Sequence, residues 1–186
     1  HVHPEPGRKQ GEWVGSFTPR RPGMYRVFGD FTPAATGRGL YASADLPVRP
    51  DPGAAKVGDD GMVRAEPGRT AIERDGYRFV LTTRPRSARA AQPIDLQFAI
   101  MRPDGGPVSL GQVMGSYAHL VAFDEARSGF AHLHPVEPGL LSAPQPKSPM
   151  LNFKLTIPRA GHYTIWAQVN LGGREVFVSF GLEVVE

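Results

Sequence analysis

Apolar and polar residues alternate along this chain in short stretches, and no segment keeps a period of 3.6 residues over ten residues. The stretches are rich in Val, Ile, Phe, Tyr and Thr, and Pro, Gly or Asp residues bound them, which is typical of β-strands. The pattern predicts an all-β protein with hardly any helix. The expected strands cover residues 13–18, 24–31, 40–46, 77–83, 94–101, 119–123, 130–134, 151–157, 162–170 and 175–185.

Part of the sequence occurs twice. When Gly23 is aligned with Gly161, SFTPRRPGMYRVF (16–28) lies over KLTIPRAGHYTIW (154–166) without a gap. A His-x-His-Pro motif precedes each copy, as HVHP in the first and HLHP in the second. Two copies of one β unit predict tandem domains of similar fold, each an antiparallel sandwich.

The first copy is shorter than the second. About three expected strands precede the HLHP motif, whereas none precedes the HVHP motif, and a sandwich needs about seven. We therefore expect a partial sandwich at residues 1–46, a Pro/Gly-rich linker at 47–69 and a complete sandwich at 70–186. Since strand edges rarely stay unpaired, residues 1–46 are a fragment of a longer chain, pack on the second copy, or gain strands from a partner or by self-assembly.

Composition narrows the functional classes. The chain has 186 residues, a formal net charge of +3 and 40% hydrophobic residues, which is ordinary globular material. Its arginines are scattered, so we expect no nucleic-acid partner. No apolar run approaches the roughly 20 residues of a transmembrane helix. The chain has no cysteine, 19 prolines and 22 glycines, a composition that favours an exported bacterial protein, periplasmic or secreted. The abrupt start at His1 suggests a processed or trimmed end.

Three of the six histidines flank one predicted hairpin. If residues 124–129 form its turn, His119 lies directly opposite His134, and His132 shares their face because side chains alternate along a strand. Three imidazoles would then lie within reach of one copper or zinc ion, which binds nitrogen at about 2.0–2.1 Å. The apolar residues on the same face, Val121, Phe123 and Phe130, are expected to belong to the core.

Further side chains are candidates for the same site. Met114 carries a thioether, which suits Cu(I), and His162 stands at the repeat position that Met24 has in the first copy. His1 and His3 are the counterparts of His132 and His134 in the HVHP motif. An N-terminal histidine also binds copper in some periplasmic and polysaccharide-oxidising proteins, but alignment of His1 with an internal residue argues against that mode here.

A structural role is the alternative for these histidines. Imidazoles on strands often bond backbone carbonyls or carboxylates, and the chain would then be a structural or assembly protein whose β domains stack or exchange strands. We expect no enzyme in either case. The sequence has no cysteine nucleophile, GxSxG, HExxH or phosphate-binding loop, and its adjacent carboxylates lie in turns.

The string MGSYAHLVAFDEARSGFAHLHP (114–135), followed by LTIPRAGHYTIWAQV (155–169), resembles a group of secreted bacterial proteins of poorly defined function. Their core reads AHLVAFD…FAHLHP, and some are described as YtkA-like or heavy-metal-associated. MYRVFGDFTP (24–33) is similar to a variant of the same element. The resemblance covers about residues 77–186, and residues 1–46 as a partial second copy. It implies an exported immunoglobulin- or cupredoxin-like sandwich with a link to metals, and it supplies no reaction.

Overall fold

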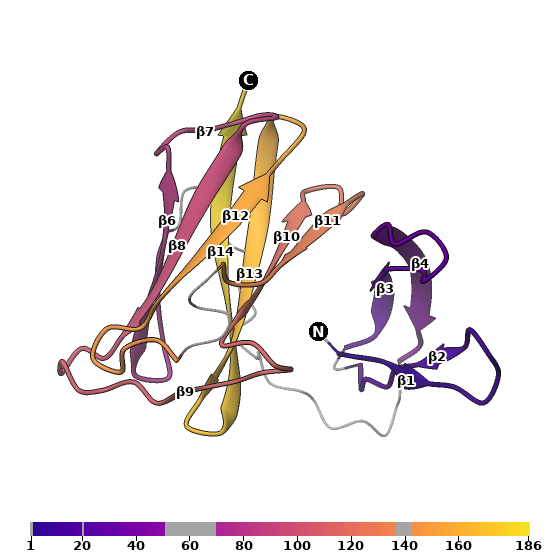
Figure 1. Cartoon of the computed structure of the whole chain (residues 1–186), viewed down its shortest axis with the longest axis horizontal. Helices are drawn as coiled ribbons and strands as arrows, with labels where there is room; N and C mark the ends of the chain where they lie inside the picture. Colours follow the sequence, from indigo (N-terminus) through magenta and orange to yellow (C-terminus); the bar gives the residue numbers. More distant parts are fainter. Residues whose placement is uncertain (1, 20, 51–69, 137–142) are drawn as a thin grey trace. The chain divides into compact units, whose positions relative to one another are not determined.

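The structure is a computed structural model that describes residues 2–19, 21–50, 70–136 and 143–186. The described residues form strands and turns and no α-helix, so the predicted all-β class is confirmed (Figure 1). No helix in these ranges is long and apolar enough to cross a membrane. The chain divides into two compact units, His1–Gly61 and Met62–Glu186.

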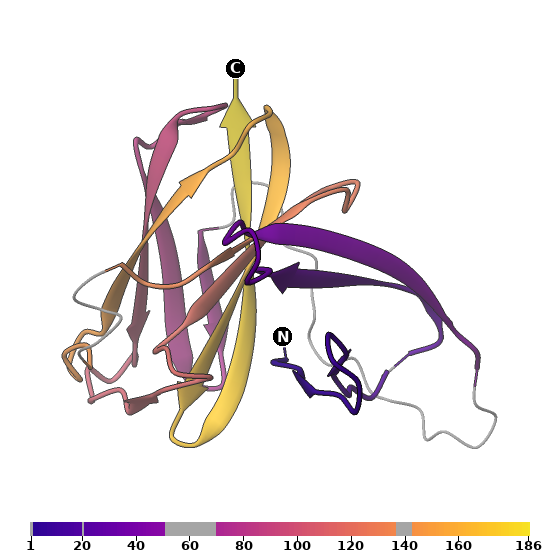
Figure 2. The ribbon, with the colours of Figure 1, turned by 45° about the vertical axis from the view of Figure 1, so that its right-hand side comes forward.

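The second unit is a sandwich of two sheets (Figure 2). One sheet has the order β12-β8-β6-β5, and the other has the order β11-β10-β13-β14-β7 with β9 beside β13. All pairs are antiparallel except β14 with β7, which is parallel. The strands are β5 (Ala71–Arg74), β6 (Tyr77–Arg84), β7 (Ala88–Arg89), β8 (Pro93–Met101), β9 (Leu110–Gly111), β10 (His119–Asp124), β11 (Phe130–Leu133), β12 (Met150–Thr156), β13 (Gly161–Leu171) and β14 (Arg174–Val185).

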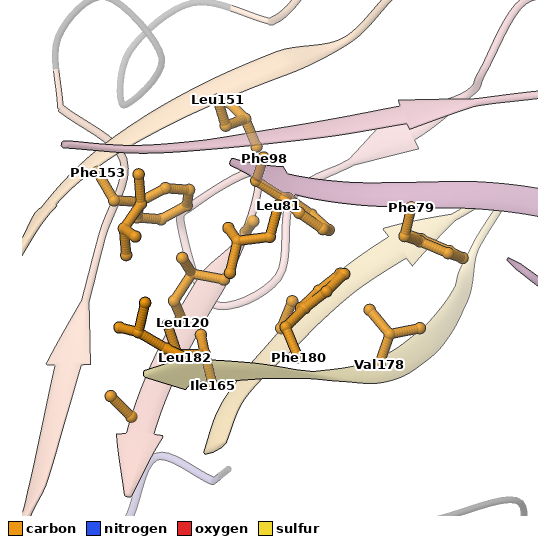
Figure 3. Close-up of a cluster of buried hydrophobic side chains, with 14 of the residues drawn as sticks. Phe79, Leu81, Phe98, Leu120, Leu151, Phe153, Ile165, Val178, Phe180 and Leu182 are labelled. Atoms are coloured by element: carbon orange, nitrogen blue, oxygen red, sulfur yellow. The ribbon is translucent and has the colours of Figure 1, made fainter. Parts of the chain in front are cut away.

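The core lies between these two sheets and follows from the alternation of each strand. In β8 every second residue is buried, and in β12, β13 and β14 the same period selects Leu, Phe, Ile and Val for the inner face. Figure 3 shows the side chains of Phe98 and Phe180 pointing toward each other from opposite sheets. Their ring centroids are 6.0 Å apart in an edge-on arrangement. Each large apolar side chain buried in this way stabilises the fold by about 1.5–3 kcal/mol.

The described residues of the first unit form two separate two-stranded sheets. β1 (Glu5–Pro6) pairs with β2 (Trp13–Val14), and β3 (Gly23–Phe31) pairs with β4 (Leu40–Val48). Only the beginning of the strand expected at 13–18 forms. β4 continues through the first two positions of the expected linker, and residues 51–69 of that linker lie outside the described residues. The ribbon of β3 and β4 is long and curved (Figure 2).

Candidate metal site

The β10–β11 hairpin has the register that the sequence predicts. Leu120 pairs with Leu133 and Val121 pairs with His132. Continued by one residue, this ladder sets His119 opposite His134, which directly follows the end of β11. The chain beyond His134 is held to the opposite sheet, because the backbone N–H of Val136 donates to the carbonyl of Asn152 at 2.8 Å. The hairpin pairing before His134 and the Val136 hydrogen bond after it therefore both fix the positions of the histidines.

The histidines lie on the outer face of their sheet. Leu120 points into the core (Figure 3), so its neighbours His119 and Val121 point to the opposite face. The expectation of core residues is wrong for Val121 and Phe123: both are half-buried on this outer face and lie outside the core cluster. The side chain of Phe130, the third residue of that expectation, lies outside the described part of the structure. Only one face of β10 packs in the core, so functional side chains can occupy the other face.

The three imidazoles converge. Their ring centroids are 5.3 Å apart for His119 and His132, 4.8 Å for His119 and His134, and 4.6 Å for His132 and His134. One ring nitrogen of each residue lies within 4.8 Å of the other two. His119 is 1% exposed, His132 is half-buried and His134 is exposed. The cluster, here called the histidine triad, thus has a buried end and a solvent-facing end.

Hydrogen bonds define the proton positions on His119. Its Nε2 lies 2.8 Å from the carbonyl oxygen of Val113, and since a carbonyl only accepts, Nε2 carries the hydrogen. In the neutral ring Nδ1 then holds a lone pair, and this atom lies 3.0 Å from His132 Nε2. His119 therefore presents a lone pair to the triad. Ligating histidines in metalloproteins are commonly oriented by such a bond from the other ring nitrogen to a carbonyl.

A tight turn supplies the carbonyl that orients His119. Val113 and Ser116 exchange backbone hydrogen bonds of 2.7 and 3.0 Å, and between them Met114 and Gly115 have φ angles of 47° and 80°. Two consecutive positive φ angles are typical of a type I′ turn. Met114, a predicted ligand, is half-buried in this turn, next to the residue that bonds His119. Gly115, which readily adopts a positive φ, is the sequence signal that could have predicted this turn.

The structure does not bring His162 to the triad. His162 is exposed near the start of β13 and pairs with Glu183, whereas His119 pairs with Gln168 of β13. Six strand positions separate His162 from Gln168, which is about 20 Å. His3 is exposed in the first unit, and His1 lies outside the described residues.

Gln168 is a neighbour of the triad that sequence reasoning missed. It is buried on the outer face of β13, and its Nε2 donates to Glu175 Oε2 at 3.0 Å. A buried amide beside a buried imidazole makes this side of the triad polar, although it lies on a sheet rich in apolar residues. No pattern in the sequence distinguishes Gln168 from an ordinary surface residue of an alternating strand.

Together these features define an antiparallel β-sandwich with a histidine triad on the outside of one sheet. The family model of a domain of unknown function, DUF8832, matches residues 70–186, and the chain belongs to this family. The matched span contains the whole triad and the turn that orients it. No curated protein matches the chain.

Proposed function

We propose that the sandwich of residues 70–186 binds one transition-metal ion, copper or zinc, through His119, His132 and His134. The observation that supports this most strongly is the convergence of three ring nitrogens within 4.8 Å of one another, from two strands in fixed register. Imidazole is a preferred ligand of both metals. The role that fits an outer-face site is metal binding and delivery, as in a carrier or chaperone.

The distances of the triad are close to those of a metal complex. With metal–nitrogen bonds of about 2.0–2.1 Å, two ligating nitrogens are at most about 4.2 Å apart, so the longest separation has to shorten by about 0.6 Å. The solvent-facing position of His134 leaves room for that adjustment. The 3.0 Å between His119 Nδ1 and His132 Nε2 lies within that limit.

Metal binding has to displace a proton within the triad. In the described structure His119 Nδ1 accepts, so His132 Nε2 is the donor of their hydrogen bond. For both atoms to ligate, the proton on His132 has to move to its Nδ1. The ion then replaces one hydrogen bond by two coordinate bonds. Protonated imidazole has no lone pair to offer, so affinity falls as pH drops below about 6.5.

A position at the solvent-facing end stays available for a fourth ligand. Water or an incoming donor reaches it past His134. Met114 lies in the turn beside the buried His119, and its thioether suits Cu(I). A site with an open position is typical of metals that react or are exchanged, whereas purely structural zinc sites are closed by four protein ligands. Export from the cytoplasm, expected from the cysteine-free composition, belongs to the same proposal.

One observation supports a structural role as the second candidate function. The hydrogen bond between His119 and His132 joins β10 to β11 without any metal, and β11 is a four-residue strand at the edge of its sheet. Under this alternative the triad secures the edge hairpin. The two functions make different demands on His134, which is exposed and takes no part in the hydrogen bond between His119 and His132.

Metal titration of the full chain tests the proposal. Cu(II) and Zn(II) are titrated by calorimetry into wild type, into a His132→Ala/His134→Ala variant, and into a His162→Ala control on the same sheet. We expect one equivalent of metal in the wild type and in the control, and none in the double variant. Failure of the folded wild type to bind either metal would overturn the function. Metal retained by the double variant would overturn the assignment of the site.

A further inference from the structure

The turn that orients His119 belongs to a connection that is tied to the neighbouring strands. Residues 112–118 join β9 to β10 and lie outside both sheets. β9 lies along the edge of β13, where Gly111 pairs with Asn170. The N–H of Gly172 donates to the carbonyl of Ser109 at 3.0 Å. The connection therefore starts from a fixed point beside the turn between β13 and β14.

The side-chain amide of Asn170 makes a further bond to this connection. Its Nδ2 donates to the carbonyl of Gln112 at 3.3 Å, and its Oδ1 accepts from the N–H of Gly173 at 2.8 Å. These partners define the orientation of the amide, because a carbonyl only accepts and a backbone N–H only donates. Asn170 thus links the β13–β14 turn to the residue directly before Val113.

Gly111 leaves room for this amide. A Cβ atom placed on Gly111 would lie 3.2 Å from Nδ2 and 3.3 Å from Cγ of Asn170, closer than side chains usually approach. The φ angle of Gly111 is not positive, so space and not backbone conformation favours glycine at this position. The pair Gly111 and Asn170 is therefore matched so that the amide can reach Gln112.

The bond to Gln112 acts on the peptide group next to the one that orients His119. The C=O of the Gln112–Val113 peptide accepts from Asn170, and its N–H donates to the carbonyl of Ser116 at 2.7 Å. A peptide group is planar, so bonds at both of its ends fix its orientation. The following carbonyl, that of Val113, accepts from His119 Nε2 at 2.8 Å.

We propose that Asn170 is a positioning residue of the histidine triad. By holding the Gln112–Val113 peptide it keeps the Val113 carbonyl aimed at His119 Nε2. That bond keeps the hydrogen on Nε2 and leaves the lone pair of Nδ1 facing the triad. In this role Asn170 contributes no ligand atom. Its effect on metal affinity rests on the proposed function, whereas its effect on His119 is present without metal.

Nitrogen-15 NMR of the metal-free full chain tests the effect on His119. The Nε2–H of this buried ring is hydrogen-bonded, so its exchange with water is slow. In Asn170→Ala we expect this exchange to accelerate by about tenfold or more. Backbone exchange at Ile165, in the core, reports global unfolding and should accelerate less. A residue that only capped the β13–β14 turn would change both rates alike.

Two further variants complete this experiment. Gly111→Ala places a Cβ against the amide of Asn170 and should accelerate exchange at His119 in the same direction, which keeps the test informative if Asn170→Ala does not fold. Gln97→Ala is the control, because it removes a side-chain amide that bonds Asn152 on the other sheet. It should leave exchange at His119 unchanged.

Calorimetric titration with Zn(II) tests the effect on affinity. Loss of a group that directly bonds a ligating histidine weakens metal binding by about 10–100-fold. Since Asn170 acts one peptide group further away, Asn170→Ala should raise the Kd by about tenfold, at the lower end of that range. Gln97→Ala should have the Kd of the wild type.

Unchanged exchange at His119 in folded Asn170→Ala overturns the inference, and so does accelerated exchange with an unchanged Kd for Zn(II). Acceleration that is equal at His119 and Ile165 also overturns it, because Asn170 then only stabilises the fold. Accelerated exchange at His119 in a protein whose wild type binds no metal supports the positioning of His119 and overturns the metal function instead.

Discussion

Replacing His119 by alanine, with His134→Ala as the control, separates the two roles considered for the histidine triad. His119 is buried, its Nε2 donates to Val113, and its Nδ1 accepts from His132. The variant removes both hydrogen bonds and leaves a space where the ring was. Both the proposed metal site and the metal-free link between β10 and β11 lose a member, so stability and metal binding have to be measured independently.

The expected loss of stability follows from these contacts. Each hydrogen bond contributes about 0.5–1.5 kcal/mol net. The Val113 carbonyl keeps the N–H of Ser116 at 3.0 Å, and the half-buried His132 regains water, so no group is left without a partner. A cavity of about 60 Å³ adds roughly 1.5 kcal/mol. The free energy of unfolding should therefore fall by about 3 kcal/mol, which lowers the melting temperature by about 10 °C.

Urea denaturation in the presence of a chelator measures this loss. Tryptophan fluorescence reports on it, because Trp166 of β13 pairs with Val121 of β10. The control is His134→Ala, which changes an exposed side chain and should shift the free energy of unfolding by no more than about 0.5 kcal/mol. Both variants should lose metal binding. If His119→Ala were no less stable than His134→Ala, the argument from burial and hydrogen bonding would be refuted.

Three other outcomes are expected. Zn(II) at a hundredfold excess over its Kd should raise the free energy of unfolding by about 2.7 kcal/mol at neutral pH. This stabilisation should disappear as pH falls below about 6.5. Stabilisation by Zn(II) that persists at acidic pH in thermal melts contradicts histidine ligation. Met114→Gly should stabilise the metal-free protein by about 0.5–1 kcal/mol, because Met114 has a φ of 47° that glycine adopts without strain. In competition titrations the same variant should bind Cu(I) more weakly and Zn(II) as tightly as the wild type. Equal weakening of the binding of both metals argues against a thioether ligand. Tyr163→Phe should lower the free energy of unfolding by about 1 kcal/mol in urea, since the bond to Arg159 is lost. Burial, and next the charge of Asp124, raise the pKa of Tyr163, so the wild type should lose stability as pH rises above the ordinary tyrosine pKa while the variant loses less; equal alkaline losses would contradict this.

The hairpin register could be predicted because its causes are local. The polar segment DEARSG (124–129) separates two apolar strands and leaves few pairings open, and the pairing of Val121 with His132 follows. The short strands β5, β7 and β9 could not be predicted in the same way. They contain two to four residues, and they exist because longer neighbours offer them a free edge.

The choice of face could not be predicted from β10 alone. Both of its faces carry apolar side chains, Leu120 and Ala122 on one and Val121 and Phe123 on the other. Which face packs in the core depends on where the opposite sheet lies, and the sequence of β10 contains no information on that. The set of residues in the site could not be predicted fully for a similar reason. His162 lies too far from the triad along the eleven-residue strand β13, and the length of that strand is known only from the structure.

The position of the histidine triad on the outer face of its sheet has a kinetic consequence. In the proposed metal site, an ion from solution would meet His134 first and would reach the other two rings without any opening of the sandwich core. Entry and exit would then be governed by collision and by exchange of one ligand for the next, on the timescale of side-chain motion. The slow fluctuations that expose a protein interior would not limit them.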